Sequence, residues 1–219
     1  MSNTILSTSS HLHRLVIGTH QLARGKVWLE KFLNVKLHAV VPSDDMGTHS
    51  YYLRIGETTS LELIAVNPQS RAPNYPRWFG LDTEDVIERI SQRPRLIGWV
   101  GRTNSLAALH ERTGELLGDL HEISAPTPCL MTSPHDGYPL EGGLIPQMLQ
   151  TNFSTAALPD QGVRFTWMEA AHPNPAKVEY LLSELGLAKT LVLTSSPPYA
   201  GMTMCAYVDT PNGVKTLMS

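Results

Sequence analysis

A glutamate and a histidine on two predicted neighbouring strands are the residues of this sequence best suited to chemistry. Glu62 lies inside the apolar run SLELI at 60–64, where a buried carboxylate is costly unless something pairs with it. His49 alternates with Tyr51 and Leu53, so it can face a cavity, and histidine titrates near neutral pH. We therefore predict Glu62 and His49 as catalytic residues and as the ligands of any metal. A hydrogen-bonded structural role is the alternative for His49.

The segment Arg77-Trp78-Phe79 follows a proline-rich stretch and places a cation beside two aromatic rings. Such a group can form a cavity wall, in which the ring stacks on a substrate and the cation attracts an acidic group. We predict Arg77 and Trp78 as substrate-binding residues. The alternative is a hydrophobic plug that closes the cavity.

A recurring order of elements positions these residues. A short β-like run is followed by an amphipathic helix and then by several short strands, and this order begins near residues 12, 96 and 163. The third copy carries the strongest helix start, because Asn174 can cap a helix whose first residue is Pro175. We predict an α+β fold with three such units. The alternative is an ordinary α+β chain with a few βα units.

The same pattern predicts how the chain is divided. Residues 68–94 hold three prolines at Pro68, Pro73 and Pro76, a fourth at their end, Pro94, and a short helix that Asp82 is expected to cap, so they form a crossing loop. The predicted segments are an N-terminal tail at 1–11, a first module at 12–67, the crossing loop, a second module at 95–153 and a third unit at 163–219.

Composition excludes several classes of protein. The formal net charge is -3 without a cluster of Lys and Arg, which argues against a nucleic-acid partner. No apolar run approaches the roughly 18 residues that a membrane helix needs, and the first ten residues do not have the pattern of a secretory signal. Cys129 and Cys205 are too few and too far apart for a disulfide framework. We predict a cytoplasmic protein without a membrane partner.

Several strings, in their order along the chain, resemble the glyoxalase-like branch of the vicinal-oxygen-chelate superfamily. They are GTHSYYLRIG, LELIAVNP, PRWFGLD, GGLIP and DTPNGV, and the resemblance runs from about residue 12 to the end. It implies paired βαβββ modules that form a cupped half-barrel sheet around a cavity, followed here by a third βαβββ-like unit. It also implies a small-molecule ligand, a divalent metal in many members and a homodimer.

The positions that hold the metal in such relatives depart from the family pattern. By the resemblance they carry Arg14, Glu62, Gly98 and Gln150 in this chain. Arginine is not a metal ligand and glycine has no side chain to offer, so Arg14 and Gly98 disfavour a divalent metal, and the cofactor stays unknown. An Arg14–Glu62 ion pair is the expected substitute, with Arg14 and Gln150 available to bind substrate. His13 is expected to point away from the cavity unless a bulge shifts the register by one residue.

Three functions follow from the resemblance. The first is binding of a small oxygen-rich molecule in the half-barrel, with lyase or isomerase activity in which Glu62 is the base and Arg14 holds a carboxylate or enolate. The second is metal-free, non-catalytic binding, as in resistance proteins. The third is an enzyme similar to ring-cleaving dioxygenases. A direct Arg14–Glu62 contact in an apolar cavity would favour the second function.

Overall fold

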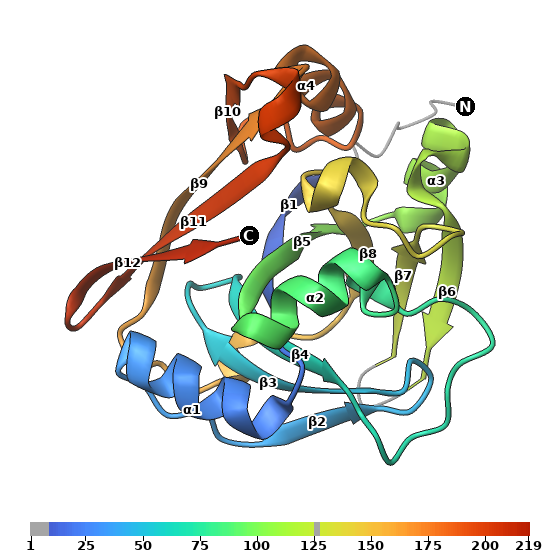
Figure 1. The fold of residues 1–219 in the computed structure, drawn as a ribbon. Helices are drawn as coiled ribbons and strands as arrows, with labels where there is room; N and C mark the ends of the chain where they lie inside the picture. Colours follow the sequence, from blue (N-terminus) through green and yellow to red (C-terminus); the bar gives the residue numbers. More distant parts are fainter. Residues whose placement is uncertain (1–8, 125–127) are drawn as a thin grey trace, which may run out of the picture.

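Two βαβββ series pair to form one curved, eight-stranded sheet, as a computed structural model shows (Figure 1). The structure describes residues 9–124 and 128–219, so most of the predicted N-terminal tail lies outside the described residues. The first series comprises β1 (Ser10–Gly18), α1 (Leu22–Leu33), β2 (Val40–Ser43), β3 (Thr48–Arg54) and β4 (Ser60–Val66). The second comprises β5 (Arg95–Thr103), α3 (Leu106–Thr113), β6 (Asp119–Ile123), β7 (Cys129–Ser133) and β8 (Gln147–Thr151).

The two series meet through their first strands. The strand order is β2-β3-β4-β1-β5-β8-β7-β6, with β1 antiparallel to β5 and parallel to β4. Leu15 on β1 lies opposite Trp99 on β5. The two residues are 84 positions apart, and the same shift superimposes the strand and helix of the first module on those of the second. The α+β class and the cupped half-barrel are therefore confirmed.

The two faces of the curved sheet have different partners. On the outer face, residues such as Leu15 and Leu63 join a hydrophobic core that includes α1 and α3. On the inner face, residues such as Val16 and Ile64 pack against the crossing loop and against α2 (Glu84–Gln92). This division follows from strand geometry, since successive side chains point to opposite faces.

The third unit has the predicted order of elements but a different strand pairing. It comprises β9 (Arg164–His172), α4 (Pro175–Glu184), β10 (Val192–Ser195), β11 (Thr203–Thr210) and β12 (Gly213–Met218). These strands form a separate sheet in the order β10-β9-β11-β12, with β9 parallel to β10. Its inner face joins the core on the outer side of the large sheet, so the third unit covers that side (Figure 1).

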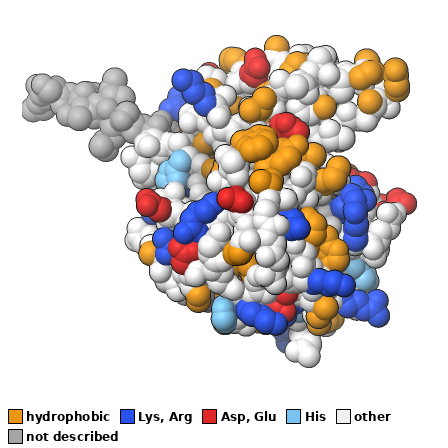
Figure 2. Space-filling model, turned by 90° about the vertical axis from the view of Figure 1, so that its left-hand side faces the viewer, with side chains coloured by type: hydrophobic (Ala, Val, Ile, Leu, Met, Phe, Trp, Pro, Cys, Tyr) orange, Lys and Arg blue, Asp and Glu red, His pale blue; other side chains and the backbone are white. Residues whose placement is uncertain are grey.

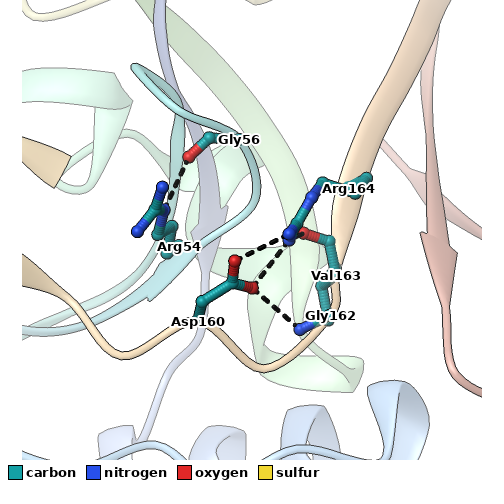
Figure 3. Close-up of polar contacts among 6 residues, drawn as sticks. All are labelled: Arg54, Gly56, Asp160, Gly162, Val163 and Arg164. Carbon is teal, nitrogen blue, oxygen red and sulfur yellow. Dashed lines mark hydrogen bonds and ion pairs between the residues drawn. The ribbon is translucent and has the colours of Figure 1, made fainter. Parts of the chain in front are cut away.

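A compact turn joins the second module to β9 (Figure 3). The guanidinium of Arg164 binds both carboxylate oxygens of Asp160, at 2.7 and 2.6 Å, and the Gly162 amide donates to the same carboxylate at 2.9 Å. These hydrogen bonds from Arg164 and Gly162 lower the pKa of Asp160 to about 2. The turn brings Phe165 to the link between β3 and β4, where its amide donates to the carbonyl of Ile55.

One of the two predicted helix caps is present and the other is not. Asn174 accepts from the amide of Lys177 at 3.3 Å and caps α4 as predicted. Asp82 does not cap α2; it pairs with Arg77 at 2.6 Å, and Thr83 occupies the cap position. The short carboxylate side chain satisfies a nearby cation, and a charge-assisted hydrogen bond is stronger than a neutral cap. Among the described residues, no helix is long and apolar enough to cross a membrane.

Candidate functional site

A cavity of about 150 Å³ opens on the inner face of the large sheet, where the first module contributes β1–β4 and the second contributes β6, β7 and β8. Most of its surface is apolar, and the polar lining side chains are one hydrogen-bonded or ion-paired cluster together with His13, Ser43, Thr48 and Thr151. The apolar wall includes Val41, Pro42, Trp78, Ile123, Met131, Leu149, Phe153 and Leu158. The polar cluster consists of Arg14 on β1, Ser50 and Tyr52 on β3, and Glu62 on β4. We call this space the first-module cavity.

The carboxylate of Glu62 is held by three neighbours. It is 2 % exposed, and its Oε1 accepts from the hydroxyls of Ser50 at 2.7 Å and Tyr52 at 2.9 Å. Its Oε2 lies 3.2 Å from Nε of Arg14, an ion pair that lacks the alignment of a hydrogen bond. The predicted ion pair is therefore present, but it is not bidentate.

The Arg14–Glu62 pair influences the charge states of the side chains around it. Burial is the largest single influence on Arg14 and disfavours its charged form, but the charge interactions with Glu62, Tyr52 and Cys129 together outweigh burial and raise the pKa of Arg14. Burial and the charge of Glu62 both raise the pKa of Tyr52, so its hydroxyl remains a proton donor. Burial also raises the pKa of the Cys129 thiol in the cavity wall. The wall therefore carries one positive and one negative charge, in direct contact.

A bulge in β1 turns His13 toward the cavity together with Arg14. The register of β1 on β5 shifts between Leu12 and Arg14, which is the exception under which His13 was expected to face inward. Its ring is 2 % exposed, lies edge-on to Phe153, and has no hydrogen-bond partner on either nitrogen among the described residues. Burial, with the charges of Arg14 and Arg102, lowers the pKa of His13 to about 3.

We expect stability to fall as the pH drops from about 6.5 toward 3. In that range the unfolded chain protonates His13, whose ordinary pKa is 6.5, while the folded protein keeps it neutral. Urea unfolding at a series of pH values measures this loss, and His13→Leu is expected to reduce the slope in this window. An unchanged slope in His13→Leu would contradict the assignment. Direct NMR titration of the ring provides a second measurement.

The segment Trp78-Phe79 is both a cavity wall and a plug. Trp78 lines the first-module cavity, and Phe79 fills the matching space of the second module. A Cβ added to Gly98 would lie 3.6 Å from the Phe79 ring, so a longer side chain there would compete with the ring for space. Phe79 has a φ of 59°, a left-handed conformation that is strained for an aromatic residue. We call this pair the aromatic plug.

The register of the sheet changes one predicted position. Val16 pairs with Glu62 on β4, and its counterpart Val100 pairs with Gln147 on β8, so Gln147 is the equivalent of Glu62. Gln150 does not reach the first-module cavity. Its Oε1 accepts from the amide of Leu106 at 2.6 Å and so caps α3 from the neighbouring strand. Gln150 lies three residues after Gln147 on β8. Because successive side chains on a strand alternate between faces, the two glutamines point to opposite faces of the sheet.

The residues at the family's metal positions do not fit a divalent metal. They are a cation, a carboxylate that already has three partners, a glycine covered by Phe79, and the amide of Gln147. Divalent metals in proteins need several oxygen, nitrogen or sulfur donors around one point. Within residues 9–124 and 128–219, no group of three or more His, Cys, Asp and Glu side chains could hold a metal ion.

Two further predicted residues lie outside the cavity. The side chains of Thr48, Ser50 and Tyr52 take the inner positions of β3 and line the cavity. His49, which alternates with them and pairs with Ala65 on β4, therefore points to the opposite face of the sheet. Arg77 binds Asp82, and its Nε donates to the carbonyl of Met46 at 3.1 Å. The structure thus gathers Arg14, Glu62 and Trp78, and it does not bring His49, Arg77 or Gln150 to them.

The sequence analysis missed Ser50 and Tyr52. They alternate with His49 along β3, so placing His49 inside excluded both. One signal could have found them, because a buried carboxylate requires donors and these hydroxyls lie on the adjacent strand. Tyr52 pairs directly with Glu62 in the β3–β4 register.

Several solved structures are similar to this chain. No curated protein sequence matches the chain. A hypothetical protein from Staphylococcus aureus has a similar structure, with 12 % identity, coverage of 95 % of this chain and 84 % of that chain, and a TM-score of 0.57. A methylmalonyl-CoA epimerase from Mycobacterium tuberculosis has 16 % identity, with coverage of 67 % of this chain and 91 % of that chain and a TM-score of 0.45. A methylmalonyl-CoA epimerase from Streptomyces coelicolor has 11 % identity, with coverage of 68 % of this chain and 98 % of that chain and a TM-score of 0.46.

The family assignment rests on a sequence match. A family model described as a glyoxalase-like domain matches residues 12–186. This range includes both modules of the large sheet, the aromatic plug and the start of the third unit. Because the match spans most of the chain, the protein belongs to the glyoxalase-like domain family.

Proposed function

We propose that the protein binds a small, oxygen-bearing molecule in the first-module cavity without a metal ion. The observation that carries this proposal is the buried Arg14–Glu62 pair in a cavity whose surface is mostly apolar. Small-molecule sites are typically apolar hollows with a few fixed polar groups that orient the ligand. Since Arg14, Ser50 and Tyr52 already stabilise the carboxylate, the site is complete without a cation.

Two measurements on the purified, untagged protein test this proposal. Elemental analysis after growth in metal-replete medium is expected to find no stoichiometric metal. Mass spectrometry of the denatured protein is expected to find a retained small molecule, and Leu149→Trp is expected to lose it by filling the cavity. Val27→Trp, on the exposed side of α1, is the matched control and should retain it. Stoichiometric metal that disappears in Glu62→Ala would contradict the proposal.

One observation supports a second candidate, an isomerase-like activity. Oε2 of Glu62 accepts no hydrogen bond and belongs to a residue that lines the cavity, so it could accept a proton from a carbon next to a carbonyl. Arg14 would then stabilise the resulting enolate. Once the ligand is known, solvent deuterium should enter it with the wild type and not with Glu62→Gln. The dioxygenase alternative requires a metal, so elemental analysis tests it as well.

We also propose that two copies pair through the outer face of the second sheet. Trp167 is 42 % exposed and stacks on Tyr207 with 4.3 Å between ring centroids. Exposed Val192, Val214 and Met218 lie on strands of the same sheet. Figure 2 shows hydrophobic side chains gathered on the face of the molecule that it presents. Light scattering should give the mass of a dimer for the wild type and of a monomer for Trp167→Glu. A monomeric wild type would contradict this proposal.

A cytoplasmic location is part of the same proposal. Cys129 and Cys205 are both free, as expected in a reducing compartment. Cell fractionation tests the location directly.

A further inference from the structure

Buried polar atoms without partners concentrate in the first-module cavity. Among the described residues, twelve buried side-chain nitrogen and oxygen atoms have no hydrogen-bond partner. Seven of the twelve belong to residues that line this cavity: both ring nitrogens of His13, Nε of Arg14, Oγ of Ser43, Oγ1 of Thr48, Oε2 of Glu62 and Nε1 of Trp78. A buried polar group without a partner is costly, so this concentration indicates a ligand that supplies the partners.

The chemistry of these atoms describes the ligand's polar end. Nε of Arg14 and Nε1 of Trp78 can only donate, whereas Oε2 of Glu62 can only accept. Nε and Oε2 lie 3.2 Å apart without a hydrogen bond between them. A hydroxyl oxygen beside them can accept from Arg14 and donate to Glu62 at once. Neither a carboxylate nor an ether can make both bonds, because neither carries a proton to donate.

The charges of the wall favour an uncharged ligand. Arg14 and Glu62 are the two charged side chains among the residues that line the cavity, and they neutralise each other. Arg102, a further cation near His13, is not among the lining residues and donates to the carbonyl of Phe153. An anion placed against Arg14 would therefore also meet the carboxylate of Glu62. A buried charge without a partner of its own is strongly disfavoured.

The volume limits the ligand's apolar part. A cavity of about 150 Å³ lined by aliphatic and aromatic side chains can hold a molecule about the size of benzene. Phe79 occupies the space beside Gly98 on β5, so the ligand cannot extend toward Gly98. The apolar body should therefore be a single ring or an equally compact chain.

We propose that the ligand is an uncharged alcohol or phenol with a compact apolar body about the size of one ring. Its hydroxyl lies between Arg14 and Glu62, and its body packs against Trp78 and Leu149. This inference rests on the proposed function, because it names the class of molecule that the same cavity binds.

Four probes that share one ring test the inference on the wild-type protein. They are benzyl alcohol, toluene, benzoate and benzylammonium, and NMR chemical-shift titration of the cavity residues measures their binding. Benzyl alcohol should bind about tenfold more tightly than toluene, because the hydroxyl gains two hydrogen bonds. Benzoate and benzylammonium should bind more weakly than either. Benzoate binding more tightly than benzyl alcohol, or toluene binding equally well, would overturn the inference and leave the proposed function intact.

The variant Glu62→Gln tests the role of charge. It removes the negative charge and leaves that of Arg14, so benzoate is expected to bind more tightly than benzyl alcohol. If the order of the two probes does not reverse, the charge argument is wrong. If none of the four probes shifts the cavity resonances of the wild type, the proposed function itself fails. The wild-type series decides the question even where the variant folds poorly.

Discussion

Replacing Arg14 with methionine is expected to lower the free energy of unfolding by about 3 to 5 kcal/mol. The substitution leaves Glu62 buried, at 2 % exposure, with two hydroxyl donors but no positive charge within contact distance. The cost is therefore mainly the desolvation of an unpaired carboxylate, since methionine keeps much of the apolar volume of the arginine stem.

Two matched variants separate this cost from a loss of packing. Arg14→Met combined with Glu62→Gln is expected to recover most of the lost stability, because no unpaired charge remains. Arg89→Met removes a partly exposed arginine whose pair with Asp85 lies on the surface, and it should cost less than about 1 kcal/mol. Urea unfolding followed by circular dichroism measures all three variants. If the double variant is no more stable than Arg14→Met, the ion pair is not the source of the effect.

Replacing Phe79 with alanine is expected to lower the free energy of unfolding by about 3 to 5 kcal/mol. Phe79 is a buried residue of the crossing loop and packs against the second module beside Gly98, so the smaller residue leaves a hollow that the rigid sheet cannot close. Thermal and urea unfolding measure the loss. A cost below about 1 kcal/mol would show that the aromatic plug is not a structural element.

The backbone at Phe79 permits a sharper comparison. Its φ of 59° suits glycine better than any other residue. Phe79→Gly is therefore expected to be at least as stable as Phe79→Ala, although glycine is ordinarily the more destabilising residue because it has greater freedom in the unfolded chain. Leu81→Ala and Leu81→Gly form the control pair, since Leu81 is equally buried but has an ordinary φ of -62°. There the glycine variant should be the less stable one.

Much of the fold could be predicted because its signals are local. Helical spacing of leucines, alternation in strands, and the Asn174-Pro175 start each act within a few residues, so the order of elements in all three units follows from the sequence. The pairing of strands in the third unit does not. The placement of β11 beside β9 rather than beside β10 depends on contacts between segments distant in sequence.

The site was predictable only in part. A carboxylate within the run at 60–64 required a partner, and the family pattern pointed to Arg14, which the structure places at 3.2 Å. His49 was assigned to the inner face from its alternation with Tyr51 and Leu53, and Gln150 from the family's ligand position in the second module. An error of one residue in strand phase moves a side chain to the opposite face, and this is what separates His49 from Ser50.

The sequence by itself determined the glyoxalase-like order of elements and the presence of a buried carboxylate that needs a partner. The order of elements and the need of the carboxylate for a partner depend on residue type and local spacing. They are the same whichever strands pair in the final sheet. The tertiary structure decided that a bulge brings His13 inward beside Arg14, that Gln147 is the counterpart of Glu62, and that Phe79 fills one half of the cup. These outcomes depend on strand register and on the path of a crossing loop, which only the packing of distant segments can set.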